Sequence, residues 1–143
     1  MNITIKYAGF ADIESIHAIE QQFISSWSYD QFIEELSRNF SILLAAYLDE
    51  AVSGYICAWI AADQAEIHSF AVSEGFFRKG IGEKLLGGLA EEAAKRGCSS
   101  ILLEVRSRNI PAVNFYKKNG FTETGRRKNY YPDDDAVLME KKI

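Results

Sequence analysis

The sequence predicts a mixed α/β domain built around one sheet. Strand-like stretches alternate apolar and polar residues or form short apolar runs, and helix-like stretches carry apolar residues three or four positions apart. Along the chain they follow the order β-α-α-β-β-β-α-β-α-β-β, which is typical of helices packed on a sheet. A length of 143 residues fits a single domain, and we assign residues 1–143 to it.

The chain begins with a strand followed by two helices. Residues 2–7 alternate apolar and polar side chains, as a half-buried strand does. Asp12 is placed to cap a helix whose apolar face is formed by Ile13, Ile16, Ile19 and Phe23. Ser28 and Gln31 have the spacing of a capping box, which predicts a short second helix through residues 32–36.

The middle of the chain predicts consecutive strands. They are expected over residues 41–48, 52–62 and 65–72, where β-branched and aromatic residues are frequent. The connections at 49–50 and 63–64 are too short for a crossover, so neighbouring strands must run antiparallel. This part of the chain is therefore expected to form an antiparallel meander.

The second half of the chain alternates helices with strands. A loop over residues 73–79 leads to a helix that begins at Gly80 and stops at Gly97, where a left-handed residue is favoured. The apolar stripe of this helix consists of Ile81, Leu85, Leu86, Leu89 and Ala93. The remaining expected elements are a strand over 100–106, a helix from Asn109 to Gly120 with Pro111 in its first turn, and strands over 121–128 and 136–141.

Composition excludes several classes of protein. The chain has 16 Lys and Arg against 20 Asp and Glu, and a net charge of −4 argues against binding nucleic acid through its phosphates. No apolar run reaches the roughly 20 residues that span a bilayer, and the N-terminus lacks the layout of a signal peptide. We therefore expect a cytoplasmic protein with no membrane partner.

The cysteines and histidines predict neither a disulfide nor a metal site. Cys57 and Cys98 have no partner motif, which is the pattern of free thiols in a reducing compartment. Two histidines and two unpaired cysteines do not provide the ligand set of a structural zinc site. We therefore expect no bound metal.

The passage from Arg78 to Glu83 is the first candidate for a binding site. Gly80 and Gly82 stand where a loop turns into a helix, and unpaired N–H groups at a helix N-terminus attract anions. Arg78 and Lys79 add positive charge. The passage is not a Walker loop, since no Gly-Lys-Ser/Thr follows, and it lacks the third glycine of a dinucleotide fingerprint. The alternative is an ordinary glycine turn before a helix.

Glu104 is the second candidate, this time for a catalytic role. It interrupts an otherwise apolar strand, and a carboxylate among apolar neighbours can serve as a general base. The alternative is a charge at the end of the strand that faces solvent or pairs with Arg106. The local sequence leaves both readings open.

Further candidates follow from spacing. Asn109 and Tyr116 lie seven positions apart and share one face of their helix, along which the phenol can donate a proton. The alternative is an aromatic ring packed on the sheet. His17 and His68 are also candidate bases, and simple alternation puts His68 on the same strand face as Phe70.

These pieces occur together in an order that resembles the GNAT superfamily of N-acetyltransferases. The resemblance covers nearly the whole chain and rests on Phe70-Ala71-Val72, Arg78-Lys79-Gly80-Ile81-Gly82, Leu103-Glu104-Val105-Arg106, Asn109, and Phe115-Tyr116-Lys117-Lys118-Asn119-Gly120-Phe121. Residues 66–139 are similar, more narrowly, to the bacterial ribosomal-protein-alanine N-acetyltransferases. That similarity includes Arg127-Lys128-Asn129-Tyr130-Tyr131-Pro132 and the later Asp135-Ala136-Val137-Leu138-Met139.

The resemblance implies a sheet that splays at its central parallel strands, with helices on both faces and acetyl-CoA in the gap. The backbone of Phe70, Ala71 and Val72 would hold the acetyl and pantetheine end. Asn109 would contact the pantetheine arm. The pyrophosphate would be cradled by the amides of Arg78, Lys79, Gly80, Ile81, Gly82 and Glu83. The family motif has Gln or Arg at the position of Phe77, but a cradle of backbone amides does not need that side chain.

The resemblance also implies catalytic and substrate-binding residues. Glu104 would be the general base, and Tyr116 would be the acid that protonates the leaving thiolate. The peptide entrance would lie near Tyr130, Tyr131, Asp133 and Asp134. An acidic cluster there can attract a basic peptide, and the alternative is a solvated hairpin loop.

The expected function is direct transfer of the acetyl group of acetyl-CoA, in a ternary complex, to the α-amine of a protein that begins with alanine. The resemblance implies that this acceptor is a ribosomal protein. An α-amine has a pKa of about 7.7–8.0, so freeing its lone pair at pH 7 costs about 1–1.4 kcal/mol, against about 4.6 kcal/mol for lysine. A site can depress an amine's pKa, so a small amine or a lysine side chain stays open as the acceptor. A non-catalytic module that binds acetyl-CoA or a partner also stays open, although it would need neither Glu104 nor Tyr116.

Overall fold

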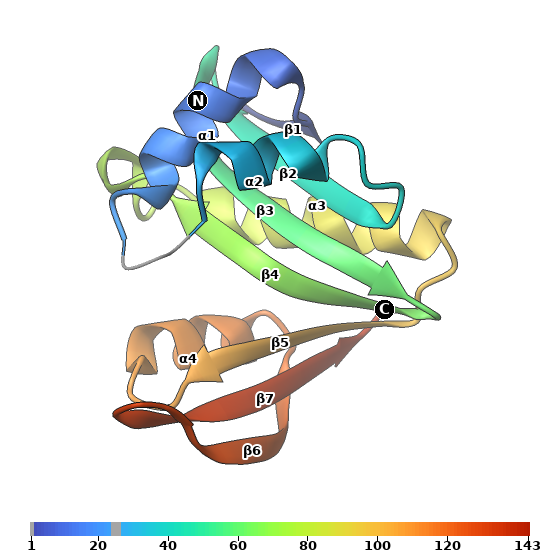
Figure 1. Ribbon diagram of the computed structural model, residues 1–143, viewed down its shortest axis with the longest axis vertical. Coiled ribbons are helices and arrows are strands. Elements are labelled where there is room, and N and C mark those ends of the chain that lie inside the picture. Colours follow the sequence, from blue (N-terminus) through green and yellow to red (C-terminus); the bar gives the residue numbers. More distant parts are fainter. Residues whose placement is uncertain (1, 24–26) are drawn as a thin grey trace.

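The protein, seen here as a computed structural model that describes residues 2–23 and 27–143, has one seven-stranded sheet (Figure 1). The strands lie in the order β1-β2-β3-β4-β5-β7-β6. Their bounds are β1 (Ile3–Tyr7), β2 (Ser41–Leu48), β3 (Ala51–Ala61), β4 (Gln64–Val72), β5 (Ser100–Arg106), β6 (Thr122–Tyr131) and β7 (Asp134–Lys142). All neighbouring strands are antiparallel except β4 and β5. The predicted fold class is therefore confirmed.

Helices cover both faces of the sheet. On one face lie α1 (Ile13–Glu20) and α2 (Tyr29–Glu35), and on the other lie α3 (Ile81–Lys95) and α4 (Ile110–Lys118). Two short 3-10 turns, η1 (Phe10–Asp12) and η2 (Glu74–Phe76), precede α1 and α3. No helix in the described part of the chain is long and apolar enough to cross a membrane.

Each face of the sheet buries its own apolar cluster. The larger cluster contains the whole predicted stripe of α3, Ile81, Leu85, Leu86, Leu89 and Ala93. The smaller cluster packs Ile13, Ile16 and Ile19 of α1 and Phe32 of α2 against β2 and β3. Burying a large apolar side chain contributes roughly 1.5–3 kcal/mol, so these stripes hold the helices on the sheet.

The predicted capping box is present, but the predicted cap of the first helix is wrong. Ser28 N donates to Gln31 Oε1 at 2.6 Å, and Gln31 N donates to Ser28 Oγ at 3.1 Å. Asp12 does not cap α1 with its side chain. Its carboxylate accepts from Gly9 N at 2.8 Å and closes η1 instead. The turn η1 lies directly before α1, and the Asp12 carboxylate bonds the backbone at the start of this turn, so it is not available to cap the helix.

Two other boundaries differ from the prediction. α1 ends at Glu20, so Phe23 lies beyond the helix and outside its buried face. The last hairpin is longer than its apolar pattern, because Tyr130 and Tyr131 belong to β6 and Asp134 to β7. The predicted acidic loop is thereby reduced to a turn at residues 132–133. Backbone pairing extends an edge hairpin through polar residues that an apolar pattern does not reveal.

The sheet splits between β4 and β5. These strands pair at only three positions, which join residues 64–66 to residues 100–102. Beyond these pairs the strands part, and Figure 1 shows them diverging toward the end at which α4 lies. The splayed central strands implied by the resemblance are therefore present.

A β-bulge in β4 overturns the predicted position of His68. Cys57 pairs with Ser69 and the next residue of β3 pairs with Ile67, so His68 is the extra residue. A bulge reverses the alternation of side chains beyond it. Phe70 therefore packs in the cluster under α3, whereas the His68 ring lies 4.1 Å from the Trp59 ring on the other face.

Candidate active site

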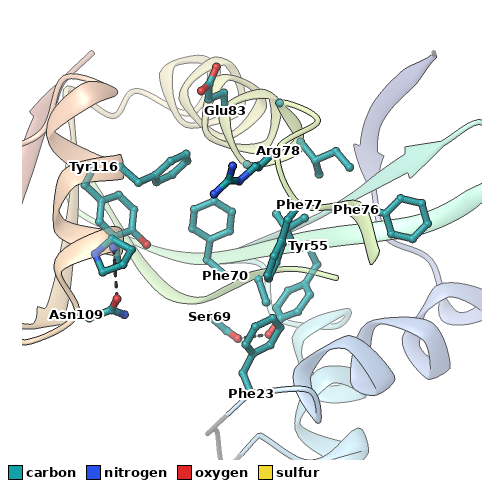
Figure 2. Close-up of a pocket in the computed structure, with 18 of the residues that line it drawn as sticks. Phe23, Tyr55, Ser69, Phe70, Phe76, Phe77, Arg78, Glu83, Asn109 and Tyr116 are labelled. Carbon is teal, nitrogen blue, oxygen red and sulfur yellow. Dashed lines mark hydrogen bonds between the residues drawn. The ribbon is translucent and has the colours of Figure 1, made fainter. Parts of the chain in front are cut away.

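A cavity of about 800 Å³ opens where β4 and β5 part (Figure 2). Its walls come from β4, from the loop between η2 and α3, and from the first turns of α4. The predicted binding and catalytic residues that line this cavity are Phe70, Ala71, Val72, Arg78, Gly80, Ile81, Gly82, Glu83, Asn109 and Tyr116. Lys79 instead lines a smaller hollow of about 390 Å³ beside α3.

The loop before α3 forms a concave arrangement of backbone N–H groups. Arg78 and Gly80 adopt left-handed conformations, with φ of 62° and 80°. Within α3 the amide of Lys84 bonds back to the carbonyl of Gly80 at 3.1 Å. The N–H groups of residues 81–83 precede this first helical bond and are left for a ligand. The positive end of the helix dipole favours a negative ligand such as a phosphate.

Gly82 lets this anion site lie directly against α4. A Cβ atom at Gly82 would come within 3.0 Å of Phe115 Cζ and 3.6 Å of Phe70 Cζ. The aromatic rings therefore occupy the space that a side chain would need. A narrow cradle of free amides backed by apolar rings fits the pyrophosphate and pantetheine of acetyl-CoA, a charged group joined to a slender arm.

We expect Gly82→Ala to weaken acetyl-CoA binding about tenfold or more, because the new methyl group displaces Phe115 toward the cavity. Titration calorimetry with acetyl-CoA measures this. Gly87→Ala in the same helix is the control, since a Cβ there meets nothing within 4 Å. It should leave binding unchanged and raise the free energy of unfolding by about 0.5–1 kcal/mol. Equal affinities of the two variants would contradict the close approach at Gly82.

β4 presents a free edge to the cavity. One edge pairs with β3 along nearly the whole strand, whereas the other pairs with β5 only at residues 64–66. In the described ranges, no strand pairs with that second edge at residues 67–72. Backbone groups of alternate residues face opposite edges of a strand, and Ser73 N bonds Ser53 O of β3, so the groups of Ala71 also face β3. Phe70 and Val72 are therefore the residues whose backbone groups can bind a ligand at the free edge, and the predicted backbone contact of Ala71 is wrong.

Two predicted residues project from α4. Asn109 caps the helix, and its Oδ1 accepts from Ala112 N at 3.3 Å. Figure 2 shows the Tyr116 hydroxyl pointing toward β4. Its ring lies 5.5 Å from that of Phe121 and 6.3 Å from that of Phe70. Burial raises the pKa of Tyr116 far above its usual value, so the phenol holds its proton at neutral pH.

Glu104 lies beside the cavity and does not line it. Leu103 and Val105 belong to the cluster under α3, so alternation along β5 turns Glu104 to the opposite face. Its Oε1 lies 3.1 Å from Arg127 Nε, and the side chain is 23% exposed. Pairing with Arg106, one of the readings left open by the sequence, does not occur, because Arg106 Nη1 bonds Asp133 at 2.7 Å.

The predicted peptide-binding residues lie on the β6–β7 hairpin, where most of their charges already have partners. Asp133 bonds Arg106, whose guanidinium stacks 4.1 Å from the Tyr131 ring. Asp134 accepts from the Ser107 hydroxyl and from Arg108 N, and these bonds lower its pKa. The rings of Tyr130 and Tyr131 meet edge to face. Burial and the nearby Glu104 raise the pKa of Tyr131.

Several residues that line the cavity were missed from the sequence. Phe23 and Phe77 form an aromatic contact at its rim, with ring centroids 6.4 Å apart. Glu20, Tyr55 and Ser69 meet on another side. The missed signal is the spacing of Glu20, which continues the buried face of Ile13 and Ile16 and so places a carboxylate on the apolar side of α1. Tyr55 and Ser69 give no comparable local signal.

Comparison with known proteins places the fold and the cavity in a family. The profile of the acetyltransferase (GNAT) family matches residues 11–121. The chain belongs to the GNAT family of acetyltransferases. This GNAT protein is therefore an acetyl-CoA-dependent N-acetyltransferase, and the implied co-substrate is one that the cavity fits. The predicted family membership is confirmed.

Relatives match this GNAT protein over nearly its full length. A relative from Salmonella typhimurium, named ribosomal protein bS18-alanine N-acetyltransferase, is 32% identical, with 95% of each chain covered. A Bacillus subtilis relative provisionally given the same name is 36% identical, with 90% of this chain and 87% of the relative covered. The crystal structure of the corresponding Escherichia coli enzyme has a TM-score of 0.90 at 28% identity, with 99% of this chain and 94% of that chain covered.

Proposed function

We propose that this GNAT protein acetylates the terminal α-amine of a ribosomal protein that begins with alanine. The observation that carries the proposal is near full-length similarity, above 30% identity, to relatives named for that activity. The cavity supports it, because one space joins the anion site at α3 to the free edge of β4 and to the face on which α1 and α2 lie. An acceptor can thus approach from one face and the cofactor from the other.

Acetyl-CoA, when bound, supplies the acetyl group as a thioester. The amides of residues 78–83 would hold its pyrophosphate, and Asn109 would contact the pantetheine arm. The free edge of β4 would align the acetyl end, and the N–H of Val72, which faces that edge, would polarise the thioester carbonyl oxygen. These groups are held by a helix and a sheet, so binding requires little reorganisation.

Two side chains would move the protons. Glu104 accepts a proton from the acceptor's ammonium, directly or through one water molecule, so that the amine can attack as a free base. Arg127 fixes the orientation of that carboxylate through its ion pair at 3.1 Å. The Tyr116 hydroxyl donates its proton to the departing sulfur. The proposed acceptor of protons thus comes from β5, beside the cavity, and the proposed donor comes from α4, which lines it.

The cysteines support direct transfer without an acyl-enzyme. Cys57 and Cys98 are buried, and neither lines the cavity. Burial raises the pKa of both thiols, most strongly for Cys57, so neither is a thiolate at neutral pH. A thiol without thiolate character is a poor nucleophile, which leaves the amine itself to attack.

The β6–β7 hairpin would receive the peptide chain that follows the acetylated residue. Tyr130 is exposed and Tyr131 is half-buried, so both rings can pack against an extended peptide. Asp133 and Asp134 give the turn a negative charge that suits a basic ribosomal protein. Because both carboxylates already bond within the chain, their contribution would be long-range attraction and not direct ion pairing.

One experiment decides between acceptors. A basic peptide that begins with alanine and contains lysines is incubated with acetyl-CoA, and fragment masses locate the acetyl group. We expect acetylation of the terminal amine, because the α-amine loses its proton several kcal/mol more easily than lysine. Acetyl on lysine alone would move the protein to the other acceptor class. Binding of acetyl-CoA without transfer to the peptide would point to a small amine or to a binding module.

A further inference from the structure

A buried glutamate outside the proposed proton relay faces the same cavity. Glu20, the last residue of α1, is 4% exposed and lines the cavity. Its Oε2 accepts from the Tyr55 hydroxyl and, at 3.3 Å, from the Ser69 hydroxyl, and these two hydroxyl groups lie 2.7 Å apart. Figure 2 shows Tyr55 and Ser69 on the side of the cavity away from α3. Residues of β3 and β4 therefore hold this carboxylate of α1 in place.

The other oxygen of Glu20 is not used by the fold. Oε1 is buried and has no hydrogen-bond partner among residues 2–23 and 27–143. No described lysine, arginine or histidine forms an ion pair with Glu20. A buried carboxylate without a cation is costly unless something compensates its charge.

Glu35 shows how this fold satisfies a buried carboxylate that serves structure alone. It is 3% exposed, and its Oε2 bonds Arg38 Nη1 at 2.6 Å. Its Oε1 accepts from Ser41 Oγ at 2.9 Å and from the Trp59 indole. It does not line the cavity. The two glutamates are equally buried, yet only the one at the cavity keeps an unpaired oxygen and an unbalanced charge.

We propose that Glu20 binds the ammonium group of the acceptor as it enters the cavity. This inference rests on the proposed function and adds the group that selects a cationic amine. An ammonium group offers three N–H donors and a compact positive charge. It can therefore donate the hydrogen bond that Oε1 lacks and balance the charge of the carboxylate. Tyr55 and Ser69 keep the carboxylate oriented, and burial raises the pKa of Tyr55, so its hydroxyl remains a donor. Deprotonation of the bound amine remains the task of Glu104.

Two peptides test the proposal on the wild-type enzyme. One begins with alanine and has a basic tail, and the other carries a propionyl group in place of that alanine, so it differs only by the missing amine. Calorimetry in the presence of CoA, which cannot acetylate, measures both affinities. We expect the amine peptide to bind roughly 10- to 100-fold more tightly, as for a hydrogen bond to a charged group. Equal affinities would overturn the proposal, and this comparison needs no variant to fold.

Glu20→Gln then assigns the preference to this residue. Glutamine keeps an oxygen for the hydroxyl groups of Tyr55 and Ser69 but removes the charge. We expect the preference for the amine peptide to fall to about twofold or less and KM for that peptide to rise by a similar factor. Acetyl-CoA affinity should not change. An undiminished preference in the folded variant would overturn the proposal.

Glu35→Gln is the matched control. It removes the same charge from an equally buried glutamate and breaks an ion pair, so it should lower Tm without altering the preference between the peptides. Loss of preference in both variants would show a general structural effect and overturn the assignment to Glu20. Failure of the wild-type enzyme to acetylate any terminal amine would instead contradict the proposed function, which these binding measurements do not require.

Discussion

Replacing Glu104 by glutamine should lower the rate of acetyl transfer at pH 7 by about 10²- to 10⁴-fold, the usual contribution of a general base. The amide has the shape of the carboxylate but cannot take the ammonium proton. The deficit should shrink as the pH rises past the α-amine's own pKa of about 8, because the acceptor then arrives neutral. Steady-state rates from pH 6 to 10 measure both effects. Affinity for acetyl-CoA should be unchanged, since Glu104 does not line the cavity.

Glu123 provides the control for Glu104. It also pairs with an arginine, since its Oε1 lies 2.7 Å from Arg126 Nε. Glu123→Gln therefore removes a comparable ion pair from the same sheet and should leave the rate unchanged. Superimposable pH profiles for Glu104→Gln and the wild-type enzyme would exclude Glu104 as the base.

Replacing Tyr116 by phenylalanine should slow transfer about 10²-fold or more while changing acetyl-CoA affinity less than twofold. Only the hydroxyl group is lost, and the ring contacts with Phe70 and Phe121 persist. The leaving sulfur would then depart without a proton donor. Single-turnover rates with the alanine-first peptide, together with calorimetry of acetyl-CoA, separate the two quantities. Tyr7→Phe, which removes a hydroxyl bonded to Arg96 away from the cavity, should not slow transfer.

The pH dependence of this donor follows from its burial. Burial raises the pKa of Tyr116, so the protonated form that donates persists at and above pH 10 and is lost only at still higher pH. Tyr116 should therefore contribute no alkaline decline of activity below pH 10. A decline in that range that disappears in Tyr116→Phe would contradict the raised pKa, and an unchanged rate would refute the role itself.

Local sequence patterns predict most of the helices and strands correctly. β2 and β5 begin and end where their apolar patterns do, and the capping box at Ser28 and Gln31 forms as predicted. The loop into α3 and the face shared by Asn109 and Tyr116 likewise line one cavity. These signals are local, because caps, turns and apolar stripes depend on residues within a few positions of one another.

The features that local patterns do not predict depend on contacts between residues far apart in the chain. The bulge that turns His68 away from Phe70 comes from the pairing of β4 with β3. Glu104 pairs with Arg127 of β6, not with its near neighbour Arg106, because the sheet order places β6 only one strand, β7, away from β5. The spacing of α1 indicates that Glu20 is buried, but its hydrogen-bond partners come from β3 and β4, which no local pattern reveals. Local patterns specify which face of an element is buried, and only the packed sheet specifies which side chains meet there.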